Sequence, residues 1–173
     1  MKMRKILLLV VMTFVGTATM TIAQELPRKV NNVNLLDLSG KSMELPYFGE
    51  KNLMIFYVDP QAHKQNHEFT VELEESHRAE SPNIYGFGVL NLKDAWYPNS
   101  MVRAMARKRT EKNGALVLAD QNRILRKEWN LGDCNDQFVL LFINKEGELV
   151  FMHKGILSEN AKAEFFAVID QYK

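Results

Sequence analysis

The sequence predicts a single α/β domain in which a largely buried sheet is covered by helices. Three short runs, residues 53–58, 84–90 and 138–143, are almost continuously apolar, as strands buried on both faces are. Segments with helical spacing of apolar residues lie between and after these runs, and such alternation is typical of layered α/β domains. No internal repeat, low-complexity stretch or interdomain linker interrupts the pattern, so we expect one domain.

The first 23 residues have the pattern of an export signal. Basic residues at positions 2, 4 and 5 precede an apolar run at 6–15, and Thr21-Ile22-Ala23 suits cleavage near Ala23. The run is too short to favour a membrane-spanning helix, and an uncleaved anchor is the alternative. We therefore expect a periplasmic or secreted protein without a stable membrane anchor after signal cleavage.

Charge and cysteine content narrow the function classes. Removal of the signal, which holds three bases and no acids, changes the formal net charge from +1 to −2. This near balance gives no reason to expect nucleic-acid binding. About 150 residues remain, enough for one domain with a substantial core. Cys134 is the only cysteine, so no intrachain disulfide can form, despite the oxidising compartment expected after export.

The domain is expected to comprise residues 33–173, preceded by a polar lead at 24–32. Its expected elements are, in order, a hairpin over 33–45, a strand at 53–58, a helix at 63–77, a strand at 84–90, a helix after residues 98–100, a strand at 115–119, a hairpin over 138–153 and a final helix after Ser158.

Turn-forming residues separate the elements of the N-terminal half. Ser39-Gly40-Lys41 stands between the two strands of the first hairpin. Pro60 closes the strand at 53–58, because proline cannot donate to a sheet ladder. In the helix that follows, Phe69 and Leu73 lie four residues apart and mark the buried stripe.

Turn-forming residues also separate the elements of the C-terminal half. Pro98-Asn99-Ser100 precedes a helix whose apolar stripe is expected to include Met101, Val102 and Met105. Asp120-Gln121-Asn122 ends the short strand after it. Asn144-Lys145-Glu146-Gly147 predicts the turn of the last hairpin. Ser158 can cap the final helix, whose apolar residues recur on one face.

Three segments resemble the thioredoxin-like superfamily, in particular its exported redoxin branch. Leu35-Leu36-Asp37-Leu38-Ser39-Gly40-Lys41 is similar to the β-hairpin that precedes the core, and residues 53–58 resemble the central strand before the active loop. Residues 138–150 resemble the late hairpin. The resemblance implies a thioredoxin-like three-layer fold, with a central mixed β-sheet flanked by helices and an N-terminal β-hairpin.

Two shorter motifs resemble the periplasmic YtfJ-type proteins, a poorly characterised thioredoxin-like family. They are Trp129-Asn130-Leu131 and Lys154-Gly155-Ile156-Leu157-Ser158. The architectural resemblance covers most of residues 33–173, and it implies a role in the cell envelope.

The residues of the redox site depart from this resemblance. A thioredoxin-like placement puts Gln61 and Lys64 at the two positions of a Cys-x-x-Cys pair, and a peroxiredoxin-like placement puts Asp59 at the peroxidatic cysteine. Gln137 stands near the position of the characteristic proline before the late strand. Ordinary dithiol oxidoreductase activity is therefore not expected, because a thiolate must attack the disulfide. Gln61, Lys64 and Gln137 become candidate binding residues.

Cys134 is the residue on which thiol chemistry would depend. The resemblance implies that its loop faces the end of the central strand, where Asp59 and His63 would complete a candidate catalytic group. The imidazole would favour the thiolate. The alternative is an incidental loop cysteine, which the neighbouring Asp133 and Asp136 favour because negative charge opposes thiolate formation.

His63 and His67 are the candidate metal ligands. Residues four apart on a helix project from one face and could bind a transition metal, with Asp59 as an oxygen ligand. The alternative is a solvated helix face, and no other cofactor is expected.

Two more groups of residues have both a binding and a structural interpretation. Trp96, Tyr97 and Trp129 could line a peptide groove or could be packed in the core. A basic run could bind phosphate or an acidic partner, or could be a solvated face: Arg103, Arg107, Lys108, Arg109 and Lys112.

We therefore expect an exported, noncatalytic thioredoxin-like protein that uses the former redox surface for binding or envelope maintenance, with an envelope protein or peptide as partner. The alternative is a redox accessory protein that uses Cys134, or a protein that handles a transition metal through His63 and His67.

Overall fold

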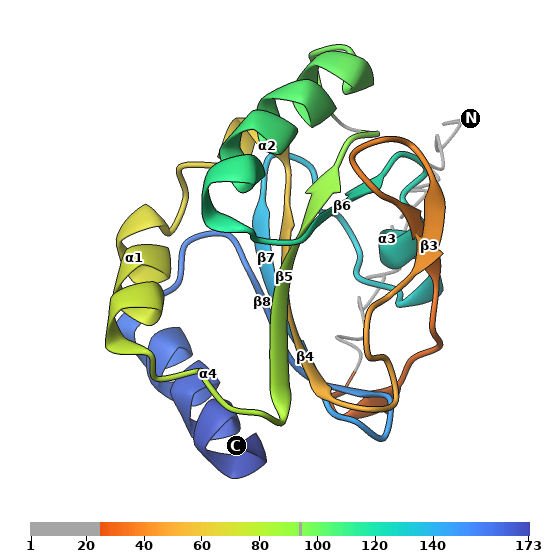
Figure 1. The fold of residues 1–173 in the computed structure, drawn as a ribbon. Coiled ribbons are helices and arrows are strands. Elements are labelled where there is room, and N and C mark those ends of the chain that lie inside the picture. Colours follow the sequence, from red (N-terminus) through yellow and green to blue (C-terminus); the bar gives the residue numbers. More distant parts are fainter. Residues whose placement is uncertain (1–24, 94) are drawn as a thin grey trace, which may run out of the picture.

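The computed structural model describes residues 25–93 and 95–173, which form a mixed sheet with helices on both faces (Figure 1). The predicted export signal lies outside the described residues. Within them, no helix combines the length and hydrophobicity needed to cross a membrane.

The strands are β1 (Arg28–Lys29), β2 (Asn34–Leu36), β3 (Ser42–Glu44), β4 (Asn52–Val58), β5 (Ile84–Asn91), β6 (Val117–Asp120), β7 (Phe138–Ile143) and β8 (Glu148–Lys154). The helices are the 3-10 helix η1 (Pro60–Ala62), α1 (His67–Ser76), α2 (Asn99–Asn113), α3 (Ile124–Glu128) and α4 (Glu159–Tyr172). In the described part of the chain the sheet order is β1-β8-β7-β4-β5-β6-β2-β3.

The ends of several central strands lie together at one end of the sheet. β4, β5 and β6 run parallel, and β7 runs antiparallel to β4. Val58 at the end of β4 therefore pairs with Phe138 at the start of β7, while Asn91 pairs with Asp120 at the ends of β5 and β6. We call this end of the sheet the carboxyl edge. It includes the loops that follow Val58, Asn91 and Asp120 and the loop that precedes Phe138. Loops at this edge of a parallel sheet commonly carry binding sites.

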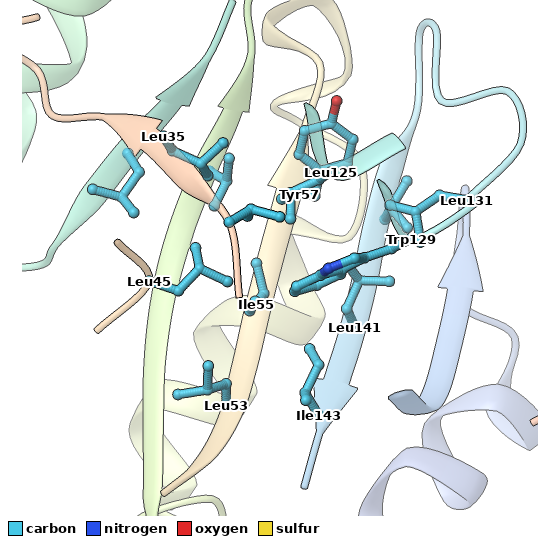
Figure 2. Packing of buried hydrophobic residues seen from close by; sticks show 14 of the residues in the cluster. Leu35, Leu45, Leu53, Ile55, Tyr57, Leu125, Trp129, Leu131, Leu141 and Ile143 are labelled. Carbon is cyan, nitrogen blue, oxygen red and sulfur yellow. The ribbon is translucent and has the colours of Figure 1, made fainter. Parts of the chain in front are cut away.

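One face of the sheet packs against α3 and the β2–β3 hairpin (Figure 1). Figure 2 shows Trp129 lying over the central strands close to Ile55 and Leu141. Trp129 is 1% exposed, and its indole N–H donates to the Asn31 carbonyl at 2.9 Å. The indole therefore fills the core and also fixes the chain that precedes β2.

The opposite face packs against α1 and α4 (Figure 1). Phe69 and Leu73 are both buried, which confirms the apolar stripe expected for this helix. The Phe69 and Phe165 rings meet edge to face with centroids 5.7 Å apart, so the two helices share one aromatic cluster. Ser158 caps α4 as expected, because its hydroxyl accepts from the Ala161 N–H at 3.2 Å.

The fold class expected from the sequence is confirmed, including the N-terminal hairpin, in which β2 pairs antiparallel with β3. The interpretation of residues 24–32 as a polar lead was incomplete, because β1 lies within it and pairs with β8. The short helix α3 was not expected at all. Five residues offer too little periodicity to be recognised in a sequence.

The expected helix over 63–77 was wrong in its first turn. η1 ends at Ala62, a turn occupies residues 63–66, and α1 starts only at His67. Asn66 interrupts the helical path with a left-handed backbone (φ 58°). Its amide donates to the Gly155 carbonyl and accepts from the Leu157 N–H, both at 2.8 Å, so contacts with the loop after β8 override local helix propensity.

Candidate functional site

The turn after β4 is organised by a buried carboxylate. Asp59 has no exposed surface and caps η1, since its Oδ1 accepts from the Gln61 N–H at 2.9 Å. Its Oδ2 accepts from the Asp136 N–H at 3.2 Å, which ties the turn to the loop before β7. Asp59 thus performs a capping role at the position where a peroxiredoxin-like placement expected a nucleophilic cysteine.

Gln61 links this carboxylate to the loop after β5. With its amide nitrogen directed at Asp59 Oδ1, its oxygen accepts from the Trp96 backbone N–H at 3.2 Å and from the indole N–H at 3.0 Å. Gln61 is therefore a contact residue between two loops of the carboxyl edge. Its candidate role in binding a partner stays a prediction.

The loop before β7 is held against the same turn. The Asp59 N–H donates to the Gln137 carbonyl at 3.0 Å, which extends the β4–β7 pairing by one residue. Gln65 bridges the two segments, because its amide donates to the Asp136 carbonyl and accepts from the Phe138 N–H, each at 3.1 Å. The turn and the loop form one hydrogen-bonded unit.

The other two candidate binding residues lie on either side of this unit. Gln137 is half-buried, and its side-chain oxygen is shielded from solvent and has no hydrogen-bond partner among the described residues. Lys64 is exposed in the turn before α1. The two differ in chemistry, since Lys64 presents an exposed positive charge and Gln137 a shielded hydrogen-bond acceptor.

Cys134 lies inside the core, where its side chain has no exposed surface. It belongs to the same apolar cluster as Trp129 and Leu131, and its thiol approaches the Gly132 carbonyl at 3.7 Å. A reactive cysteine needs access to its substrate, and buried structural cysteines are inert. Its burial supports the interpretation of Cys134 as a packing residue, and a catalytic role for it stays a prediction without structural support.

His63 lies at the surface, whereas the Cys134 thiol is buried in the core. It is exposed at the end of η1, and its Nδ1 lies 2.8 Å from the Pro60 carbonyl within its own turn. His63 is separated from His67 by the non-helical turn before α1, so the helical spacing on which the metal hypothesis rested is absent. No group of three or more His, Cys, Asp or Glu residues within 25–93 and 95–173 is placed to hold a metal.

Two polar residues that sequence reasoning missed complete the buried part of the carboxyl edge. Asp120 has no exposed surface and accepts from the Ile124 and Leu125 N–H groups at 2.8 and 3.0 Å, so it holds the start of α3. The Tyr57 hydroxyl donates to Asp120 Oδ2 at 3.3 Å. Asn91, also without exposed surface, donates from its amide to the Cys134 carbonyl at 3.4 Å.

A signal for these residues exists in the sequence. Each apolar run of the parallel sheet is followed at once by a polar residue that could hydrogen-bond: Asp59 after β4, Asn91 at the end of β5 and Asp120 at the end of β6. Because these strands are parallel, their ends meet at one edge. The pattern locates a buried polar cluster, although it does not tell a structural cluster from a catalytic one.

The basic run proves to be divided between two roles. Arg107 donates to the Leu38 carbonyl at 2.6 Å, and the Arg103 guanidinium lies beside Gly40, so both hold the turn of the β2–β3 hairpin. In that turn the Ser39 hydroxyl and neighbouring N–H groups hold the pKa of Asp37 below its ordinary value. Lys108 and Arg109 are exposed.

The three aromatics do not form one groove. Trp129 is buried on one face of the sheet, whereas Trp96 and Tyr97 are exposed in the loop after β5. The carboxyl edge thus has buried polar residues in its interior and exposed aromatic rings at its surface. Such an arrangement can recognise a partner, and its described residues offer no exposed thiol.

No protein-family model matches the sequence, and no curated protein matches it either. Solved structures do share its architecture. The exposed lipoprotein thioredoxin Etrx1 of Streptococcus pneumoniae is 17% identical, with a TM-score of 0.51 over 80% of this chain and 99% of that chain.

Two other solved structures are similar to a comparable degree. The thioredoxin domain of a thiol-disulfide oxidoreductase from Bacteroides vulgatus is 12% identical, with a TM-score of 0.55 over 82% of this chain and 96% of that chain. The 2-Cys peroxiredoxin of Plasmodium vivax is 14% identical, with a TM-score of 0.54 over 83% of this chain and 93% of that chain. Sequence identities this low show nothing about activity. The structural similarity shows that this chain has a thioredoxin-like fold.

Proposed function

We propose that this chain is a noncatalytic, exported thioredoxin-like protein that uses its carboxyl edge to bind an envelope protein or peptide, as part of envelope maintenance. The observation that carries the proposal is the chemistry of that edge. Asp59 is a buried capping carboxylate at the position that a peroxiredoxin-like placement gives to a cysteine, and the single thiol, Cys134, is buried. A surface without an accessible thiolate can recognise a polypeptide but cannot exchange disulfides with it.

Export and the YtfJ-type branch are part of the same proposal. The basic and apolar pattern of residues 1–23 supports cleavage near Ala23 and release into the periplasm or beyond. The motifs Trp129-Asn130-Leu131 and Lys154-Gly155-Ile156-Leu157-Ser158 support the narrower family. The role requires neither a cofactor nor nucleic acid.

The noncatalytic part is tested by comparing the mature protein with its Cys134→Ser variant in two assays, insulin reduction and exchange with a glutathione mixed disulfide. We expect both proteins to give the background rate. A thiol reagent should label native Cys134 slowly and should label it fully after unfolding in urea, because the side chain has no exposed surface. An exchange rate that depends on Cys134 would overturn the proposal.

The binding part is tested in cells with a photo-crosslinking amino acid at position 97, in the exposed aromatic loop, and at position 145 as the matched control. Lys145 is also exposed, in the β7–β8 turn at the opposite end of the sheet. We expect discrete protein adducts from position 97 and none from position 145. Absence of adducts at position 97 in an exported, folded protein would remove the binding role.

A further inference from the structure

An exposed apolar surface borders the carboxyl edge. Four of the six large hydrophobic side chains exposed in the described residues lie between positions 96 and 105. Their exposed fractions are 87% for Trp96, 60% for Tyr97, 51% for Met101 and 64% for Met105. We call these four side chains, together with Lys108 and Arg109, the α2 surface. A concentration of this kind marks an interaction site more often than scattered exposed residues do.

Helical spacing separates the α2 surface from the structural side of the helix. Met101, Met105 and Lys108 are spaced i, i+4 and i+7, so they share one side of α2. Arg103 and Arg107 hold the hairpin turn from another side of the same helix. The apolar stripe expected for this helix was therefore wrong at both methionines, because Met101 and Met105 are exposed and only Val102 is buried.

The charge around the α2 surface is mainly positive. Residues 95–110 contain four basic residues and no acidic one, and the exposed Glu111 follows them on the same helix. Two of the four are engaged at the hairpin turn, and Lys108 and Arg109 remain exposed next to the methionines. An apolar area with a positive border is complementary to a partner that places carboxylates beside apolar side chains.

Trp96 is held in position although its ring is exposed. Its backbone N–H and its indole N–H both donate to the Gln61 oxygen, at 3.2 and 3.0 Å. A ring that is already oriented loses less conformational freedom on binding than a mobile one. Tryptophan is also among the residues that most often dominate the energy of protein interfaces. The two methionines are more adaptable and can fit partners of different shape.

We infer that the α2 surface docks an acidic polypeptide segment, in which apolar side chains alternate with carboxylates. This inference rests on the proposed binding role of the carboxyl edge and names the chemistry of its partner. Trp96 and Tyr97 provide flat apolar contacts, Met101 and Met105 extend the apolar area, and the Lys108 and Arg109 side chains pair with the carboxylates.

Two observations favour a polypeptide over an anionic membrane. Tryptophan at a membrane interface combines an apolar ring with an N–H free for the polar region, whereas the Trp96 N–H is engaged by Gln61. The mature chain also carries a formal net charge of −2 after the expected cleavage. An extended anionic surface would repel this overall charge, whereas a short acidic segment meets mainly the local positive charge.

The test uses two fluorescein-labelled synthetic peptides with the same leucine and phenylalanine positions, one with glutamate and one with lysine between them. We expect the glutamate peptide to bind the full mature protein at low salt by fluorescence anisotropy, and the lysine peptide to bind at least tenfold more weakly. The double variant Lys108→Gln/Arg109→Gln should bind the glutamate peptide about tenfold more weakly, as loss of two exposed charge pairs implies. Met101→Ser/Met105→Ser should weaken it by a similar factor.

The matched control is Lys127→Gln/Lys145→Gln, which removes the same charge from exposed positions on α3 and the β7–β8 turn. It should bind the glutamate peptide as the wild type does. All substituted side chains are exposed, so equal urea midpoints will show that each variant is folded. Equal binding of the two peptides, or equal weakening by the control variant, would overturn the inference.

A membrane partner gives a different result. The wild type would then sediment with vesicles of phosphatidylcholine and phosphatidylglycerol, and the Lys108→Gln/Arg109→Gln variant would not. Such sedimentation without any binding of the glutamate peptide would also overturn the inference. The proposed function is judged separately. Adducts at position 97 without binding of the glutamate peptide would retain the binding role and reject an acidic partner.

Discussion

At the scale of single residues, the Asp59 carboxylate accepts from the N–H groups of Gln61 and Asp136 in a site without exposed surface. We predict that Asp59→Ala lowers the free energy of unfolding by about 2–3 kcal/mol, because buried donors lose a charged acceptor. Asp59→Asn retains one oxygen and should cost less. Urea denaturation measures both.

Asp133 supplies the control for this measurement, since it is an exposed neighbour on the same loop whose carboxylate meets Arg126 at 3.3 Å. Asp133→Ala should cost less than about 1 kcal/mol, as loss of an exposed ion pair does. If Asp59→Ala were as stable as Asp133→Ala, the assignment of Asp59 as the residue that organises the turn would be wrong.

Asp170 provides the residue-scale prediction for pH. The hydrogen bond from Arg78, with a smaller contribution from Lys173, holds the pKa of Asp170 below its ordinary value. Because the folded pKa is the lower one, this contribution to stability is present above about pH 4 and is lost as pH falls through the folded pKa. Carboxyl NMR titration should show a raised midpoint in Arg78→Gln and a smaller rise in Lys173→Gln. Equal midpoints in wild type and Arg78→Gln would contradict this account.

At the scale of secondary-structure elements, Ser158 fixes the start of α4. Its hydroxyl accepts from the Ala161 N–H, so Ser158→Ala should lower the free energy of unfolding by about 1 kcal/mol. Ser158→Asp keeps an acceptor and should remain within a few tenths of a kcal/mol of wild type. Thermal or urea unfolding decides between them, and an equal loss in both variants would exclude capping as the cause.

Elements were predictable from sequence where a local signal defined them. The apolar runs of β4, β5 and β7 and the capped helix α4 were expected close to their observed positions. The break before α1 was not, because it depends on the Asn66 side chain reaching Gly155 and Leu157, far along the chain. Local helix propensity carries no information about such a distant partner.

The candidate site was predictable to a lesser degree. The absence of cysteine from the turn after β4 follows directly from the residues at 59–64. The burial of Cys134, by contrast, depends on how its loop packs under the sheet with Trp129 and Leu131. The exposure of Trp96 could not be anticipated either, since an apolar residue is expected inside unless a partner or a neighbour holds it out.

At the scale of the whole molecule, the sheet includes a segment that the sequence presents as a polar lead. β1 pairs with β8, the Arg28 guanidinium donates to the Trp129 carbonyl at 2.7 Å, and the Trp129 indole donates to the Asn31 carbonyl at 2.9 Å. Residues before β2 therefore close one side of the Trp129 core. Polar composition concealed this role, because the contacts are made largely by backbone groups and one arginine.

We therefore predict that a chain beginning at residue 33 is less stable than one beginning at residue 25, by about 2–4 kcal/mol. The shorter chain loses the β1–β8 pairing and leaves the buried Trp129 N–H without its acceptor. Urea unfolding should be followed by tryptophan fluorescence in a Trp96→Phe background, so that Trp129 alone reports. Its emission should also shift to longer wavelength in the shorter chain, because the core beside it opens to water. Equal midpoints for the two chains would show that residues 25–32 are the dispensable lead that their composition suggests.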